Sequence, residues 1–264
     1  MSEQRQVLVF HRAAGFVHQS IPVGVAAIEA LGERHGFGVE ATDDPARFTA
    51  DIGWFDVIVF LQTSGNVLPE QAQRRALEEY IANGGGFFGI HAASSMAPDV
   101  GTDWPWFRDL VGASFKGHTV AKLYCDDEVP ERRGVEWAGR LAEAPDDAEW
   151  IGAALALTSW ETATVHVEEP GSPAIRGISD GEVLSDEWYG FHENPRAHVN
   201  VVATVDEATY APYLGEMGDD HPIVWWREFG GGRSVYNSMG HTAATWGDPR
   251  FLETILGGIE LACG

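Results

Sequence analysis

The sequence predicts an α/β fold in which a mostly parallel central sheet is covered by helices on both faces. Short, continuously apolar runs such as Phe55–Leu61 are typical of strands buried on both sides. Segments with helical spacing of apolar residues alternate with these runs over residues 6–91, which is the pattern of βαβ units. The 264-residue chain is long enough to bury such a core.

The first half of the chain supplies the parallel strands and two helices. Strands are predicted at Gln6–His11, Val39–Thr42, Phe55–Leu61 and Gly86–His91. One helix opens at Pro22 and ends at Gly36 and Gly38, and a second opens at Pro69 and ends at Asn83–Gly86. Proline suits a first helical turn and glycine suits a helix end, so both helices have ordinary boundaries.

The second half is predicted to add strands and a closing helix. The strands are Val165–Val167, Glu182–Leu184, Val199–Val205, Ile223–Phe229 and Arg233–Met239, and the helix is Pro249–Leu261. Gly230–Gly232 lies between the last two strands and favours a hairpin. Residues 126–163 are acidic and rich in alanine, and we expect part helix and part loop there. No repeat or long linker marks a boundary, so residues 1–264 are predicted to form a single domain.

Composition narrows the class of partner. Lys and Arg number 17 against 40 Asp and Glu, so the formal net charge is −23. That charge repels phosphate backbones and anionic lipid, and we expect neither a nucleic-acid nor a membrane partner. Cys125 and Cys263 make neither a disulfide framework nor a thiolate zinc site. The sequence carries no secretion signal or membrane span, so a cytoplasmic location is expected. The oligomeric state stays open, a homo-oligomer included.

Histidines stand at the predicted carboxyl ends of several strands, where ligands bind in open parallel sheets. His11 ends the first strand, His91 ends the fourth, and His241 follows a late strand. One such histidine is more often structural, but three that should converge favour a site. His18 lies in the first strand–helix loop, where Ser20 is a helix-capping candidate.

Two further groups of residues carry candidate chemistry. Asp186 and Glu187 precede Trp188 and Tyr189, and a carboxylate beside imidazoles orients a histidine, acts as a base or binds a metal. Asp103–Phe107, which contains Trp104, is an aromatic cluster that suits the apolar faces of sugar rings, although such residues are more often core anchors.

An ordered series of motifs resembles the ThuA-like, or trehalose-utilisation, family. The motifs are Gly84–His91, Asp103–Phe107, Leu110–Gly112, Phe115–His118, Asp186–Tyr189, Asn194–Arg196, Asp206–Tyr210, His221–Trp225, Gly240–Thr242 and Phe251–Glu260. The resemblance implies a flavodoxin-like three-layer sandwich related to class I glutamine amidotransferases. It places His91 at the elbow where those enzymes carry a nucleophilic cysteine, and His241 at their catalytic histidine. Without that cysteine, glutaminase chemistry is not expected.

The resemblance also implies a role in sugar catabolism, including keto-sugar derivatives of disaccharides, and divalent metal binding in some members. This sequence departs from the family pattern at Ser95 and Ala244, where acidic residues are common, and at Phe16–Gln19 in the first loop. Residues 126–163 resemble an insertion. Fewer carboxylates leave fewer hard oxygen ligands, so a changed substrate, a changed reaction and a loss of catalysis all stay open.

Three functional hypotheses follow. The leading one is an enzyme that acts on a sugar or keto-sugar-like molecule by hydrolysis, elimination or isomerisation. In it His91 and His241 are acid and base, and Glu187 orients one of them or acts as a second base. The second is a divalent-metal enzyme in which histidines and Glu187 hold an ion such as zinc. The third is a carbohydrate-binding protein without catalysis. The substrate-binding residues are expected to be His11, His18, Ser94, Trp104, His118, Asp186 and Tyr189.

Overall fold

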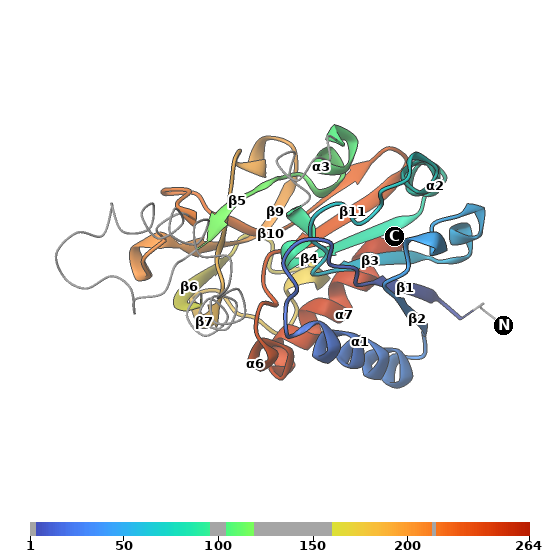
Figure 1. Cartoon of the computed structure of the whole chain (residues 1–264). Helices are drawn as coiled ribbons and strands as arrows, with labels where there is room; N and C mark the ends of the chain where they lie inside the picture. Colours follow the sequence, from blue (N-terminus) through green and yellow to red (C-terminus); the bar gives the residue numbers. More distant parts are fainter. Residues whose placement is uncertain (1–3, 96–103, 119–159, 213–214) are drawn as a thin grey trace, which may run out of the picture.

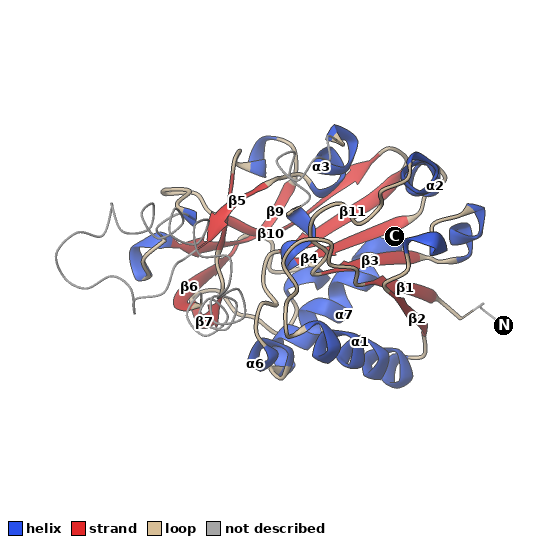
Figure 2. Ribbon diagram, in the orientation of Figure 1, coloured by secondary structure: helices blue, strands red, loops and turns tan. Residues whose placement is uncertain are grey.

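A nine-stranded mixed sheet is the centre of the protein (Figures 1 and 2). The structure is a computed structural model that describes residues 4–95, 104–118, 160–212 and 215–264. The sheet has the order β2-β1-β3-β4-β11-β10-β9-β6-β7, and β5 and β8 form a separate pair. The strands are β1 (Gln6–Phe10), β2 (Gly38–Thr42), β3 (Val57–Leu61), β4 (Gly86–Ile90), β5 (Phe115–His118), β6 (Glu161–Val167), β7 (Glu182–Asp186), β8 (Tyr189–Phe191), β9 (Asn200–Asp206), β10 (Pro222–Phe229) and β11 (Gly232–Asn237).

The sheet consists of a parallel half and an antiparallel half. From β2 to β11 every neighbouring pair is parallel, with Val7 opposite both Val39 and Val57, and Gly86 opposite both Val57 and Arg233. From β11 to β7 every pair is antiparallel. The order β2-β1-β3-β4-β11 is that of flavodoxin-like sheets. The predicted α/β fold with a mostly parallel core is therefore confirmed.

Helices cover both faces of the parallel half (Figure 2). They are α1 (Ile21–His35), α2 (Gln71–Ala82), α3 (Pro105–Val111), α6 (Ala243–Trp246) and α7 (Pro249–Cys263). Alternate residues of a strand point to opposite faces. In β1, Val7 and Val9 therefore join the core under α1 and α7, whereas Leu8 and Phe10 join the core under α2 and α3. Among the described helices none is long and apolar enough to cross a bilayer.

The predicted elements were found with shifted ends. The second helix begins at Gln71 rather than Pro69, and the last strand ends at Asn237 rather than Met239. The β10–β11 hairpin is confirmed. Strand β6 starts at Glu161, so the last residues assigned to the insertion are sheet; residues 126–159 lie outside the described part of the chain. The division into one domain with an insertion stays a prediction.

The carboxyl ends of β1, β3, β4 and β11 meet at one edge of the sheet. The residues that follow these ends are His11, Gln62, His91 and Ser238. Gln62 and His91 have positive φ angles of 50° and 52°, a backbone conformation that non-glycine residues rarely adopt. Such strain is found where the surrounding structure over-determines a residue, often at a functional site.

Close packing of α7 against the Pro173–Ile175 turn gives a test of the fold. A Cβ at Gly257 would collide with the backbone carbonyl of Pro173. In a helix, alanine is ordinarily more stable than glycine by about 1 kcal/mol. The collision with Pro173 therefore decides whether Gly257→Ala stabilises or destabilises the protein. We expect Gly257→Ala to lower the free energy of unfolding by about 3 kcal/mol in denaturant titrations. Gly171→Ala, where a Cβ meets nothing within 4 Å, should change it by less than about 0.5 kcal/mol. A Gly257→Ala protein as stable as the parent would contradict this packing.

Candidate functional site

Four buried side chains meet at this edge of the sheet: His18, His91, Glu187 and His241. One ligand-type atom from each lies within 4.8 Å of the others. His91 Nε2 is 3.1 Å from Glu187 Oε2 and 3.2 Å from His241 Nδ1, and His241 Nδ1 is 3.1 Å from the same Glu187 oxygen. The His18 ring stands edge-on to the rings of His91 and His241, with centroids 4.9 and 5.3 Å away.

Hydrogen bonds at its ring and at its backbone carbonyl hold His91 in place. Its Nδ1 donates to the carbonyl of Ser238 at 2.7 Å, because a carbonyl only accepts. Nε2 therefore faces Glu187 and His241. The Tyr236 hydroxyl donates to the His91 carbonyl at 2.7 Å and also contacts Ser94 Oγ at 2.9 Å. These contacts stabilise the left-handed turn that aims the ring into the cluster.

His241 is placed by its neighbours' backbone. The carboxylate of Asp186 accepts hydrogen bonds from the amides of Gly240 and His241 at 2.8 and 3.0 Å. From the opposite side Gln62 Nε2 donates to the Gly240 carbonyl at 2.5 Å, and Ser20 Oγ donates to the His241 carbonyl at 2.6 Å. Ser20 is at the start of α1, but its side chain makes no capping hydrogen bond. Ser20 therefore occupies the N-cap position that the sequence suggested, but its hydroxyl positions His241 instead of capping the helix.

Glu187 lies between β7 and β8 and links the cluster to two further residues. Its Oε1 is 3.3 Å from His118 Nδ1, at the end of β5. The ring of Tyr189, which pairs with His118 in the β5–β8 ribbon, lies 4.2 Å from the ring of His91. His118 is the more open of the two, with a quarter of its side chain exposed (25%).

The charges of the cluster offset the cost of burial. Burial alone would raise the pKa of Glu187, but His118 and His241 outweigh it and hold that pKa well below the usual value. Burial would lower the pKa of His241, yet the Glu187 carboxylate raises it. The pKa of His18 is lowered well below the ordinary value by burial and then by His91 and His241, so this ring stays neutral.

The donor set fits a divalent metal ion. Three imidazoles and one carboxylate are a common ligand set for zinc, and ligand atoms about 2.0–2.2 Å from a tetrahedral ion stand roughly 3.3 Å apart. The measured separations of 3.1–3.2 Å are close to that. His18 Nδ1 is buried without a hydrogen-bond partner among the described residues. A buried, unpaired imidazole nitrogen beside three other donors is what a bound cation would satisfy.

The sequence profile of the family described as "ThuA: Trehalose utilisation" matches residues 6–262. The chain belongs to the ThuA family. Its structure is similar to that of a putative ThuA-like protein from Bacteroides uniformis, with a TM-score of 0.70 at 20% identity over 98% of this chain and 91% of that one. A second, from Parabacteroides merdae, has a TM-score of 0.67 at 16% identity over 99% and 90%.

More distant likeness extends to a cytoplasmic protein from Salmonella typhimurium LT2, with a TM-score of 0.54 at 13% identity over 97% of this chain and 99% of that one. At such identities these structures show that the fold is shared. No curated protein matches the sequence. Family membership supports a carbohydrate-related role for the chain.

In this ThuA-family chain two of the predicted site residues lie apart from the cluster. His11 follows β1 and its amide bonds to the Thr42 carbonyl at 3.0 Å. Trp104 begins α3, donates to Glu78 at 2.8 Å and stacks on Phe107. By local sequence His11 and Trp104 were as good candidates for the site as the residues of the cluster. The reason is that a position at a strand end or in an aromatic cluster does not determine which way the side chain points.

Two other predicted site residues, Ser94 and Asp186, hold the residues that position the cluster. Ser94 contacts Tyr236, and Asp186 is 1% exposed with its oxygens taken up by backbone amides. Sequence reasoning missed Gln62 and Tyr236. A polar residue directly after a buried strand was the available signal for Gln62, whereas Tyr236 inside β11 read simply as core.

A pair formed by the buried His221 and the partly buried Glu207 fixes the backbone of β8. His221 Nε2 donates to the Tyr189 carbonyl at 2.8 Å, and His221 Nδ1 lies 2.8 Å from Glu207 Oε1. Glu207 also accepts from the amides of Met217 and Gly218 at 2.6 and 2.9 Å. Burial would raise the pKa of Glu207, but the contact with His221 and these amides lower it overall. The pair therefore ties Tyr189, and with it the ring on His91, to the loop after β9.

This lowered pKa predicts how stability changes with acid. A carboxyl whose folded pKa lies below its unfolded value, ~4.3, stabilises the fold above that value and loses the effect as the pH falls through the folded pKa. We expect Glu207→Gln to lower the free energy of unfolding at pH 7 by about 1–3 kcal/mol, and the difference from the parent to shrink below pH ~4. Denaturant titrations at several pH values measure it. The exposed Glu228→Gln is the control, and a gap that stays constant down to pH ~3 would rule out this role for Glu207.

Proposed function

We propose that this ThuA-family protein is an enzyme acting on a sugar or keto-sugar-like small molecule, with a divalent cation such as zinc held by His18, His91, Glu187 and His241. The observation that carries the proposal is the convergence of four buried donor atoms within 4.8 Å. Family membership supports the carbohydrate class of the substrate. The reaction class, hydrolysis, elimination or isomerisation, is part of the proposal.

A cation accounts for contacts that the side chains alone leave unbalanced. Because His91 Nδ1 carries the proton given to Ser238, neutral His91 would aim a lone pair at Glu187 Oε2 from 3.1 Å. His18 Nδ1 has no partner at all within the described chain. A positive charge among these atoms relieves both problems.

A divalent ion at such a site supplies Lewis-acid polarisation of a carbonyl or hydroxyl oxygen. The residues around it have separate tasks. His118 stands 3.3 Å from Glu187 Oε1 and is partly exposed, so it is placed to exchange a proton with a substrate at the rim. Tyr189 holds the face of His91, and the exposed Phe16 ring, 4.9 Å from His18, offers a flat apolar surface to a sugar ring.

A metal-free acid–base enzyme is the second candidate. Two opposite shifts favour this candidate: the pKa of His241 is raised and the pKa of the neighbouring Glu187 is lowered. The two side chains then form a buried imidazolium–carboxylate pair. In that case His241 donates a proton and neutral His91 accepts one through Nε2. The two candidates use the same residues and differ in whether a cation or a proton fills the centre.

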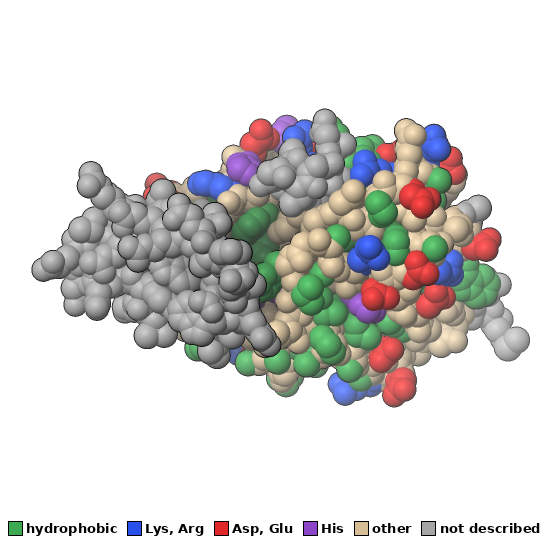
Figure 3. All heavy atoms as spheres, in the orientation of Figure 1, with side chains coloured by type: hydrophobic (Ala, Val, Ile, Leu, Met, Phe, Trp, Pro, Cys, Tyr) green, Lys and Arg blue, Asp and Glu red, His purple; other side chains and the backbone are tan. Residues whose placement is uncertain are grey.

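The proposed setting is the cytoplasm, with a small molecule as partner. Acidic side chains are visible at many points on the described part of the face in Figure 3, and the net charge is −23, which disfavours nucleic acid and anionic membranes. A structural relative from Salmonella typhimurium LT2 is a cytoplasmic protein. The proposal covers a monomer and a homo-oligomer alike.

Metal analysis tests the first candidate. Protein purified without a histidine tag should contain close to one equivalent of a divalent transition metal, and chelation should lower its melting temperature. Glu187→Gln should weaken metal affinity by more than the roughly 10–100-fold that loss of an outer hydrogen bond costs, because it removes a ligand. His166→Gln, which changes an exposed histidine paired with Asp180, should bind metal like the parent. Equal affinity in the parent and Glu187→Gln would eliminate the metal site.

Turnover tests the activity itself. Trehalose, related disaccharides and their keto derivatives are incubated with the protein, and products are followed by mass spectrometry and NMR. A product that has gained water, lost water or kept its mass identifies hydrolysis, elimination or isomerisation. His91→Ala should abolish turnover while circular dichroism stays that of the parent, with His166→Gln fully active. Sugar binding without any product would make the chain a carbohydrate-binding protein instead.

A further inference from the structure

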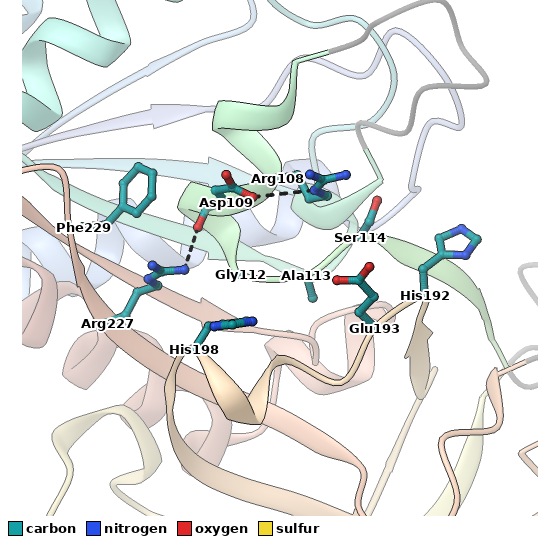
Figure 4. Close-up of a pocket in the computed structure, with 10 residues that line it drawn as sticks. All are labelled: Arg108, Asp109, Gly112, Ala113, Ser114, His192, Glu193, His198, Arg227 and Phe229. Carbon is teal, nitrogen blue, oxygen red and sulfur yellow. Dashed lines mark hydrogen bonds and ion pairs between the residues drawn. The ribbon is translucent and has the colours of Figure 1, made fainter.

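A second cavity, of about 510 Å³, lies beneath the end of α3 (Figure 4). None of its lining residues belongs to the histidine–glutamate cluster. They come from α3 and the residues after it, from the residues that follow β8, from the loop before β9 and from β10. Its volume falls in the range of about 300–1,000 Å³ that is typical of small-molecule sites.

The cavity collects basic side chains on a strongly acidic protein. Over the chain, Asp and Glu outnumber Lys and Arg by 40 to 17. Here Arg108, Arg227, His192 and His198 accompany only Asp109 and Glu193. Arginine is the side chain best suited to phosphate and carboxylate groups, since its planar fork presents several donors at once.

Arg227 is held in place by a backbone carbonyl and by an aromatic ring. Its Nη1 donates to the backbone carbonyl of Asp109 at 3.1 Å, and its guanidinium carbon lies 5.0 Å from the centre of the Phe229 ring. The Nε atom is buried without a hydrogen-bond partner among the described residues. Figure 4 shows Arg227, His198 and Glu193 directed at the same space below α3. A guanidinium carries five N–H donors, so the terminal nitrogens of Arg227 keep further donors for a ligand acceptor in that space.

The floor of the cavity is rigid. Trp225 Nε1 donates to the Val111 carbonyl at 2.7 Å and so ties the end of α3 to β10. Gly112 follows with a φ of +93°, and a Cβ there would stand 3.0 Å from both Trp225 Nε1 and Val199 Cγ1. Backbone and indole therefore meet at a spot that only glycine fits, and the cavity is largely formed before a ligand arrives.

The two carboxylates of the lining, Asp109 and Glu193, restrict which anions the cavity can bind. Glu193 would repel a bare phosphate but accepts hydrogen bonds from hydroxyl groups. Arg108 is held only loosely by Asp109, at 3.7 Å with both side chains more than half exposed, so its charge stays available. A molecule with an anionic group at one end and hydroxyls at the other matches both sets of residues.

We propose that this cavity binds an anionic sugar, with its phosphate or carboxylate on Arg108, Arg227 and His198 and its hydroxyls on Glu193. The site is separate from the cluster of His18, His91, Glu187 and His241, and the proposal does not depend on the metal or on the reaction assigned there.

Calorimetric titration of the whole chain tests the proposal with four probes: glucose 6-phosphate, glucuronate, glucose and inorganic phosphate. At least one anionic sugar should bind, and glucose and phosphate should each bind at least tenfold more weakly than it does. Arg108→Gln and His198→Gln should each reduce that affinity by roughly tenfold or more, because Arg108→Gln removes a charge-assisted hydrogen bond and His198→Gln removes the ring N–H donor. The affinity should also fall as salt is raised. The sugar that binds separates the phosphate from the carboxylate source.

Two controls keep the result interpretable. Arg47→Gln removes a surface arginine paired with Glu40 and should bind the probe like the parent. His91→Ala changes the other site and should also leave this binding intact. Failure of both anionic sugars to bind at millimolar concentration overturns the proposal, as does inorganic phosphate binding equally well. Binding that is lost in His91→Ala but kept in Arg108→Gln would move the ligand to the cluster and overturn it too.

Discussion

The buried carboxylate of Glu187 is the constraint on which this edge of the protein depends. A side chain that is 3% exposed keeps its charge only if partners replace the lost water, since the desolvation of an unpaired ion costs several kcal/mol. His118 and His241 are those partners, at 3.3 and 3.1 Å. Its neighbour Asp186 is buried as well, but hydrogen bonds from the backbone amides of Gly240 and His241 stabilise that carboxylate instead. One acid thus organises imidazoles and the other organises backbone.

The cluster lies where the two halves of the sheet meet. The parallel half contributes His91 after β4 and Gln62 after β3, both in strained left-handed turns. Glu187 comes from the antiparallel half, between β7 and β8, and His241 from the segment after β11 that joins them. Because strands from both halves supply donors, the site exists only when the whole sheet has formed. The strain at His91 is balanced by the hydrogen bond from Tyr236 and by the ring contact with Ser238.

The β5–β8 ribbon touches both candidate sites. At one end His118 and Tyr189 stand against Glu187 and His91. At the other end Ser114 and His192, joined by a backbone hydrogen bond of 3.0 Å, line the cavity under α3. The same two short strands therefore run from the proposed metal site, which His118 and Tyr189 contact, to the cavity, which the flanking residues Ser114 and His192 line. His221, which binds the Tyr189 carbonyl, holds the ribbon from a third direction.

The sequence by itself determined the α/β fold, the parallel core and the family, because apolar runs, proline and glycine at helix ends and ordered motifs are local properties. It also placed His11, His91 and His241 at strand ends that a parallel sheet brings to one edge, and it singled out Glu187 as a carboxylate suited to act beside imidazoles. The sequence proposed His18, His11 and Trp104 alike for the site, and only the tertiary structure decided that His18 joins the cluster whereas His11 and Trp104 do not. The tertiary structure also selected Gln62, Ser20 and Tyr236 as supports. The physical reason is that periodicity reports which residues are buried, whereas the direction of a side chain depends on backbone angles and on neighbours distant in the chain.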